Sequence, residues 1–162
     1  METNNKQLRW DNYFLDLCLR SAEMSYDPST KVGAVIVGPD KEIRSTGFNG
    51  FPRGIIDSAE RYENRDTKLD LIIHAEMNAI LAAARVGVSV KNCSLYLIAK
   101  DNKNNIWGGL PCHRCMAEAI QAGISEIVSI PLDNTPSRWL NSLEISKTLA
   151  AEAGIKCREV KQ

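Results

Sequence analysis

The stretch "LIIHAEMNAILAAAR" at residues 71–85 runs from three apolar residues into a histidine, a glutamate and an alanine-rich segment. Alanine, leucine and methionine favour helices, so the stretch predicts a helix over residues 75–86. His74 and Glu76 then lie where an apolar segment meets the start of that helix. The role of these two polar side chains becomes clear only with a second stretch, "LPCHRC" at residues 110–115, where another helix is predicted to begin.

Outward from these two stretches, helices and strands alternate along the chain. The apolar patterns predict helices over residues 8–24, 75–86, 115–122 and 142–153, and strands over residues 32–37, 42–47, 94–99, 126–130 and 156–160. The first two strands form a hairpin, and the alternation after it predicts an α/β sheet with helices on both faces. We expect one domain over residues 1–162. Residues 51–70 are charged and fit no element, and segments of this kind are often functional or mobile.

The composition limits the function classes. Positive and negative side chains balance to a formal net charge of zero, and aromatic residues make up 6% of the chain. A protein that coats nucleic acid usually carries a basic face, so we expect no nucleic-acid partner, while a small anionic substrate remains compatible. No apolar run approaches the roughly 20 residues of a membrane span, and the N-terminal residues lack a signal-peptide core. We therefore expect a cytoplasmic protein whose five cysteines are thiols or metal ligands.

The chemistry-bearing residues are His74, Glu76, Cys112 and Cys115. A Cys-x-x-Cys at a helix start places two sulfurs on one turn, close enough to share a metal, and His74 supplies a third ligand. Three protein ligands on zinc leave a fourth position for water, which is the catalytic arrangement. Zn²⁺ makes that water acidic, and a carboxylate that is not a ligand, Glu76, can take its proton and hand it to a leaving group.

Other interpretations of the same residues are open. A histidine at a helix start is often a cap or a satisfied core residue, and a Cys-x-x-Cys can be a redox pair or half of a structural zinc site. A thioredoxin-like pair would follow the first strand, whereas this pair comes late in the chain. A structural site needs a fourth ligand, and His113 lies inside the cysteine pair, where geometry disfavours shared ligation. Cys18, Cys93 and Cys157 follow apolar patterns and are expected to be core thiols.

Two pairs of motifs resemble a known family. His-x-Glu followed by Pro-Cys-x-x-Cys is the signature of the zinc nucleobase deaminases. "HAEMNAI" and "LPCHRCMAEAIQAGI" resemble the cytidine and deoxycytidylate deaminase superfamily, and "DPSTKVGAVIV" and "GFNGFPRG" resemble its deoxycytidylate (dCMP) deaminases. The tRNA adenosine deaminases share the zinc motifs but lack the Asn-Gly-x-Pro-x-Gly tail and tend to be basic.

The resemblance implies a cytidine-deaminase-like three-layer αβα sandwich with a mixed five-stranded sheet. It implies zinc-dependent hydrolytic deamination of dCMP to dUMP and ammonia, with activation by dCTP, inhibition by dTTP and assembly into a homohexamer. The alternatives are deamination of another cytosine nucleotide, deamination of a nucleic-acid base as in the tRNA enzymes, and a zinc-stapled module without catalysis.

Site roles follow from the same resemblance. His74, Cys112 and Cys115 would bind Zn²⁺, and Glu76 would protonate N3 of the pyrimidine and then the departing ammonia. The backbone at Ala75 would face the pyrimidine. Asn49 would contact the sugar, although an asparagine in Asn-Gly is also a common turn residue.

The phosphate of a mononucleotide needs cations or backbone N–H groups. Lys31, with the hydroxyl groups of Ser29 and Thr30, and Arg138 are the candidates, and each is also explained as a solvated surface group.

An effector nucleotide would bind near Gly50, Arg53 and Asn78, with Mg²⁺ and the charged residues 60–70. The alternative is a solvated loop. The chain also departs from the dCMP deaminase pattern, because Leu132 stands near the position of a tyrosine of the substrate pocket. We expect Trp139 to pack the last helix against the sheet rather than to replace that tyrosine.

Overall fold

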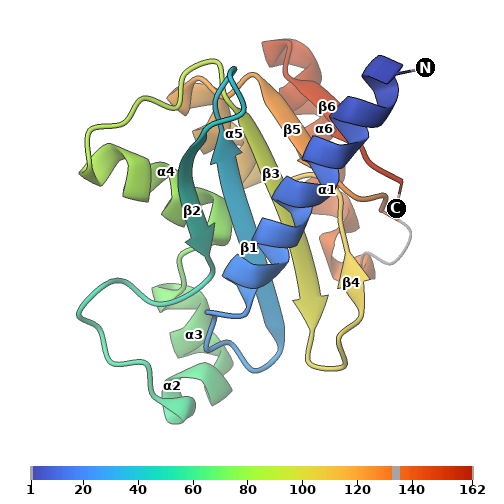
Figure 1. Cartoon of the computed structure of the whole chain (residues 1–162). Coiled ribbons are helices and arrows are strands. Elements are labelled where there is room, and N and C mark those ends of the chain that lie inside the picture. The colour runs from blue at the N-terminus through green and yellow to red at the C-terminus, as the bar shows by residue number, and fades with distance from the viewer. Residues whose placement is uncertain (1, 133–135, 162) are drawn as a thin grey trace.

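A mixed β-sheet forms the centre of the molecule, and helices cover both of its faces (Figure 1). The computed structural model describes residues 2–132 and 136–161. The strands are β1 (Thr30–Val37), β2 (Ile43–Phe48), β3 (Ser94–Asp101), β4 (Ile106–Trp107), β5 (Glu126–Ser129) and β6 (Lys156–Glu159). The helices are α1 (Glu2–Ala22), α2 (Ala59–Glu63), α3 (Arg65–Leu71), α4 (Ala75–Arg85), α5 (His113–Ala122) and α6 (Leu140–Ala153), with a 3₁₀ turn η1 (Ser137–Trp139).

The strand order is β2-β1-β3-β5-β6. β1 runs antiparallel to β2 and β3, whereas β3, β5 and β6 are parallel. Parallel neighbours need a crossover, and helices α5 and α6 supply it. The expected mixed five-stranded sheet is therefore confirmed, with the two-residue strand β4 added beside β3.

Side-chain alternation along the central strands separates two apolar cores. Ala34 and Ile36 of β1 face α4, α5 and α6, while Val35 and Val37 face α1. Both faces of β1 and β3 are buried, so both faces must be covered by helices. The three-layer αβα arrangement is confirmed by this division.

Glycines allow the helices to approach the sheet closely. A Cβ atom on Gly33 of β1 would lie 1.8 Å from the carbonyl oxygen of Cys18 in α1. On the other face, a Cβ atom on Gly47 of β2 would lie 2.2 Å from the carbonyl oxygen of Ala75. Gly47 thus sets how near the first turn of α4, which carries the His-x-Glu motif, comes to the sheet.

The structure corrects the sequence prediction in the segment 51–70. This segment contains two short helices, α2 and α3, and each begins with a side-chain cap: Ser58 accepts from the Arg61 N–H at 3.4 Å and Asn64 from the Thr67 N–H at 3.0 Å. Helices of five and seven residues are too short to show an apolar period.

One cysteine also differs from expectation. Cys18 and Cys93 are buried, but Cys157 is exposed because β6 is the edge strand of the sheet. Within residues 2–132 and 136–161, none of the helices combines the length and the apolar character that crossing a lipid bilayer requires.

Candidate functional site

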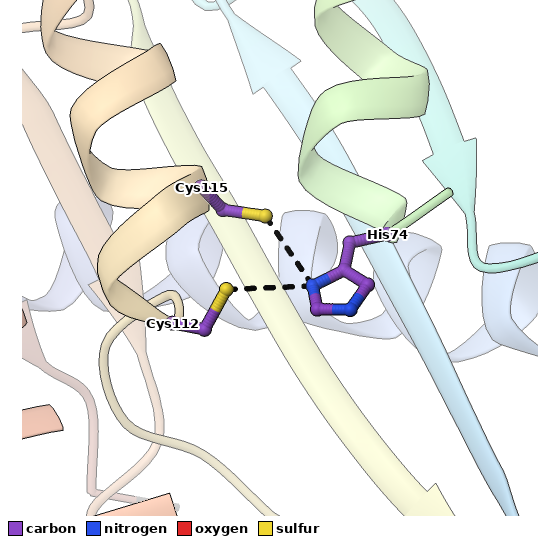
Figure 2. A group of neighbouring side chains, drawn as sticks. All are labelled: His74, Cys112 and Cys115. Carbon is purple, nitrogen blue, oxygen red and sulfur yellow. Dashed lines mark hydrogen bonds between the residues drawn. The ribbon is translucent and has the colours of Figure 1, made fainter. Parts of the chain in front are cut away.

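The first turns of α4 and α5 bring His74, Cys112 and Cys115 together (Figure 2). His74 is the N-cap residue of α4 and Cys112 that of α5, yet neither side chain makes a capping hydrogen bond. Both side chains are therefore free to meet in the space between the helices. Nδ1 of His74 lies 3.4 Å from Sγ of Cys112 and 3.4 Å from Sγ of Cys115.

These distances fit a tetrahedral zinc ion. Zinc–sulfur bonds of about 2.3 Å and zinc–nitrogen bonds of about 2.0 Å at tetrahedral angles separate the sulfur and nitrogen atoms by about 3.5 Å. In the described parts of the chain, the group consists of these three residues, whose ligand atoms lie within 4.8 Å of one another. His113 does not join them, since its Nδ1 lies 2.9 Å from Oγ of Ser142. Three ligands are the donor set of a catalytic zinc site, whereas structural sites use four.

Hydrogen bonds within the group shift the protonation of its side chains: Cys112 is favoured as the thiolate, whereas His74 and Cys115 hold protons that metal binding has to displace. Hydrogen bonds with Cys115 and His74 lower the pKa of the Cys112 thiol to about 4, against the opposing effect of burial. The hydrogen bond with Cys112 raises the pKa of His74 to about 9. Negative charge is thus stabilised on sulfur, and the thiolate is the form of cysteine that ligates metals.

Glu76 lies beside this group but does not belong to it. Its side chain is buried, with 4% of the residue exposed, and it lines the same cavity as His74 and Cys112. Burial raises the pKa of the Glu76 carboxyl above its ordinary value because a charged carboxylate loses its hydration there. A carboxyl group of this kind, close to a metal position and shielded from water, is suited to proton transfer.

The cavity has a volume of about 460 Å³, within the range of small-molecule sites. Its walls are mainly apolar and include Leu97, Trp107, Leu110 and Leu143. Trp139 also lines the cavity, with its ring centroid 6.5 Å from that of His74 and the two rings nearly perpendicular at 82°. Trp139 therefore borders the cavity, whereas we expected it to pack α6 against the sheet.

The predicted substrate residues are distributed unevenly around this cavity. Asn49, Ser29 and Arg138 line it, whereas Lys31 is not among its lining residues because its neighbours Thr30 and Val32 point inward instead. Ala75 is fully buried between two lining residues, His74 and Glu76.

The amide of Asn49 is largely engaged within the protein. Its Oδ1 accepts from the Val32 N–H at 2.7 Å. Its Nδ2 donates to the Thr30 carbonyl at 2.8 Å and to Asp27 at 3.3 Å. Asn49 thus fixes the segment that leads into β1 while it lines the cavity.

Three charged lining residues were not predicted as substrate contacts: Asp27, Arg65 and Lys68. Lys68 Nζ lies 2.8 Å from Oδ2 of Asp27, which is itself buried. Arg65, Lys68, Leu69 and Ile72 all line the cavity, and their spacing is that of one helix face. That spacing was the signal in the sequence, but a helix had to be recognised in the segment 51–70 before it could be used.

The predicted effector residues do not line the cavity. Gly50 forms an isolated antiparallel bridge with Ile73, and Asn78 donates to the Phe48 carbonyl at 2.8 Å. Arg53 is exposed on the loop after β2. Gly50 and Asn78 thus lie behind the first turn of α4, on the side of β2.

Comparison with known proteins gives a consistent result. The sequence model of the family described as "Cytidine and deoxycytidylate deaminase zinc-binding region" matches residues 8–130. The deoxycytidylate deaminase of Mus musculus is 37% identical over 126 residues, which cover 75% of this chain and 64% of the mouse protein. The chain therefore spans somewhat less than two thirds of that relative. An uncharacterised deaminase of Aliivibrio fischeri is 34% identical over 149 residues, with 91% of each chain covered.

Solved structures agree on the fold. The dCMP deaminase of the cyanophage S-TIM5 in its apo form superposes with a TM-score of 0.66 at 19% identity, covering 92% of this chain and 95% of the phage chain. Its complex with dCMP and dUMP superposes with a TM-score of 0.60, covering 98% and 96% of the two chains.

Proposed function

Since this chain belongs to the family of cytidine and deoxycytidylate deaminases, we propose that it hydrolyses dCMP to dUMP and ammonia, with Zn²⁺ held by His74, Cys112 and Cys115. The observation that carries the proposal is a three-ligand group with a buried, unligated Glu76 in one cavity. We take residues 1–162 as a single deaminase domain.

When bound by His74, Cys112 and Cys115, Zn²⁺ would supply Lewis acidity, which lowers the pKa of a water molecule toward 7 and so would provide a nucleophile for C4 of the cytosine ring. The protein supplies proton transfer. Glu76 accepts one proton of the water and delivers it to N3 of the pyrimidine as the bond from oxygen to C4 forms. It then takes the second proton from the hydroxyl group now on C4 and passes it to the amino group, so that the C4–N bond breaks, ammonia leaves and a C4 carbonyl remains. Its raised pKa is suited to a group that must both accept and donate a proton.

The remaining lining residues hold the substrate and exclude water. The apolar walls around Leu97, Leu110 and Leu143 suit a pyrimidine ring, and Trp139 offers an aromatic edge or face beside His74. Excluding bulk water strengthens the electrostatic interactions on which proton transfer depends.

The test is ammonia release from dCMP, CMP, deoxycytidine and dCTP by the zinc-loaded protein. We expect turnover of dCMP at the highest kcat/KM. Turnover of none of the four would refute the proposal, and preferential turnover of CMP would place the chain with another cytosine nucleotide.

The matched variant is Glu76→Gln, which keeps the size of the side chain and removes its proton transfer. We expect kcat to fall by at least about 10²–10³-fold while zinc content and melting temperature stay unchanged. Unchanged turnover in Glu76→Gln would show that Glu76 has no part in the chemistry, as in a zinc-stapled module.

We also propose, from the resemblance of residues 47–54, that dCTP with Mg²⁺ activates a homohexamer and dTTP inhibits it. Because Gly50, Arg53 and Asn78 lie outside the cavity, effectors bound near them would act from a separate site. Initial rates at sub-saturating dCMP, with and without each effector, would test this part of the proposal, and rates that respond to neither nucleotide would remove it.

A further inference from the structure

Two serines of helix α6 contact the chain on either side of Cys112. The Ser146 hydroxyl donates to the Pro111 carbonyl at 2.6 Å. Oγ of Ser142 accepts from the His113 N–H at 3.1 Å. Residues four positions apart share one face of a helix, so α6 directs both hydroxyl groups to the same short segment. That segment carries one of the three candidate metal ligands at its centre.

Ser142 supplies a cap that α5 does not provide for itself. The first N–H groups of a helix have no partner inside it, and the side chain of the N-cap residue usually accepts from one of them. Cys112 is the N-cap residue of α5 but makes no such bond, and Ser142 accepts from the N–H of the next residue, His113, instead. The same Oγ lies 2.9 Å from Nδ1 of His113, so two contacts hold the Ser142 hydroxyl in place. The sulfur of Cys112 is thereby left available to a metal.

Ser146 has no explanation in the stability of α6 itself. The residue is fully buried in the middle of the helix, where alanine is the better helix former and a hydroxyl is costly without a partner. A serine or threonine inside a helix commonly bonds back to the carbonyl four positions earlier, as Thr148 does to Glu144 at 3.2 Å. Ser146 instead bonds across to Pro111, which is also buried. Its hydroxyl thus connects α6 to the segment that leads into Cys112.

The segment that leads into Cys112 is also fixed from the sheet. The Gly109 N–H donates to Oγ of Ser129 and to the Ile130 carbonyl, at 3.1 Å each. Ser129 in turn donates to a carbonyl of β3 at 2.8 Å. Residues 109–113 are therefore held both by the end of β5 and by α6. Metal–ligand distances tolerate deviations of only about 0.2 Å, so a ligand that follows a segment outside helices and strands benefits from such anchors.

We propose that Ser142 and Ser146 are positioning residues for the candidate ligand Cys112. By fixing the backbone on both sides of it, they place its sulfur 3.4 Å from Nδ1 of His74, so that metal binding needs little rearrangement of the chain. The inference rests on the zinc ligands of the proposed function and is independent of the substrate. Helix α6 lies beyond residues 8–130, which the family model matches, so the zinc motifs alone do not indicate these two serines.

The experiment measures the zinc affinity of the purified protein by competition with a chelator. We expect Ser146→Ala and Ser142→Ala each to weaken zinc binding by about tenfold or more, the effect typical of hydrogen-bond partners that orient a metal ligand. Ser142→Thr keeps the hydroxyl group and should retain zinc affinity within about twofold of wild type. Ser125→Ala is the matched control and should do the same. The Ser125 hydroxyl also donates to a backbone carbonyl, that of Cys93 at 3.3 Å, but Ser125 lies beyond the other end of α5.

A second readout distinguishes positioning from a general loss of stability. Thermal unfolding of the zinc-free protein should show lower stability for both Ser146→Ala and Ser125→Ala, because each loses one hydrogen bond. Only Ser146→Ala should also change the thiolate-to-metal charge-transfer absorption of the protein loaded with Co²⁺, because this band depends on how the sulfur meets the metal. Ser142 is half-buried, so Ser142→Ala provides the same comparison should Ser146→Ala not fold.

Unchanged zinc affinity in both alanine variants would overturn the proposal, and so would an equal loss in Ser125→Ala. Zinc binding does not require turnover, so this proposal and the proposed function fail separately. A protein that deaminates dCMP and binds zinc equally well with and without the two hydroxyl groups keeps its function and loses the positioning serines. A protein with the expected losses of zinc affinity but without turnover of any cytosine nucleotide keeps the positioning serines and loses the function.

Discussion

At the scale of single residues, the candidate metal centre consists of three side chains at the starts of two helices, and the N-cap side chains among them make no capping hydrogen bond. His74 and Cys112 are N-cap residues without side-chain caps, and Cys115 follows one turn later. Helix formation therefore does not consume their polar atoms. The metal site and the helices are consequently separable in mutational tests.

We expect Cys112→Ser to abolish tight zinc binding, because a serine hydroxyl is a far weaker zinc ligand than a thiolate. Zinc per chain after dialysis, measured by plasma mass spectrometry, should fall from about one to near zero. Cys157→Ser is the control, since Cys157 is exposed and outside the group. Full zinc retention in Cys112→Ser would mean that Cys112 is not a ligand.

Asn49 has two proposed roles, a structural one and a contact with the substrate sugar, and the two predict different effects of its substitution on stability. Its amide makes three hydrogen bonds within the protein, so Asn49→Ala should lower the free energy of unfolding by about 2 kcal/mol by leaving buried partners unpaired. Urea denaturation measures this loss, with the exposed Asn102→Ala as control. An unchanged unfolding midpoint with a raised KM for dCMP would instead indicate that Asn49 acts on the sugar alone.

At the scale of elements, the site depends on how closely α4 packs against β2. Gly47 permits this approach, because a Cβ there would collide with Ala75 O at 2.2 Å and Ala79 N at 2.4 Å. Both colliding atoms belong to the backbone, so no side-chain rotation relieves the contact. Any added carbon must displace the helix that carries His74 and Glu76.

We expect Gly47→Ala to lower the free energy of unfolding by about 3 kcal/mol, the upper part of the range for overpacking, and to weaken zinc binding as α4 shifts. Gly50→Ala, three residues further along the chain, is the matched control, because the atom nearest to an added Cβ there would lie at an ordinary 3.7 Å. Thermal unfolding and zinc competition with a chelator give the two readouts. Equal effects of both substitutions would show that backbone freedom, rather than the packing distance, matters.

At the scale of the whole molecule, a partly buried ion pair joins helix α1 to strand β6, near the two ends of the described chain. Arg158 of β6 donates to Asp11 of α1 at 2.9 Å and to Glu126 of β5 at 3.2 Å. Tyr96 of β3 also donates to Asp11, at 2.7 Å. Burial tends to raise the pKa of Asp11, but hydrogen bonds from Arg158, Tyr96 and Gln7 outweigh it and hold the pKa below its ordinary value.

We expect Arg158→Met to lower the free energy of unfolding at pH 7 by about 3 kcal/mol, because it leaves a buried carboxylate without its cation. A carboxylate with a lowered native pKa stabilises the fold above its unfolded pKa, about 3.8, and loses that contribution as the pH falls toward the lower native value. The difference between wild type and Arg158→Met should therefore shrink when urea denaturation is repeated at pH 3. A difference of equal size at both pH values would contradict an electrostatic origin.

The sequence by itself determined the layered α/β fold and the residues of the candidate metal centre. The spacing of apolar residues predicted β1, β3, α1 and α4. A long helix or strand that buries one face must place apolar residues at regular intervals in its sequence. The His-x-Glu and Pro-Cys-x-x-Cys motifs predicted His74, Glu76, Cys112 and Cys115, because each motif falls at the start of one helix.

Only the tertiary structure decided which other residues share the cavity with these ligands. The short helix α3 buries none of its residues, so its sequence carries no core pattern, and its Arg65 and Lys68 meet Asp27 and Arg138 only through the folded chain. The placement of Trp139 in the cavity and of Lys31 outside it is likewise set by how η1 and β1 sit against the sheet. Contacts between segments far apart in the chain depend on the packing of the whole sheet, which no local pattern encodes.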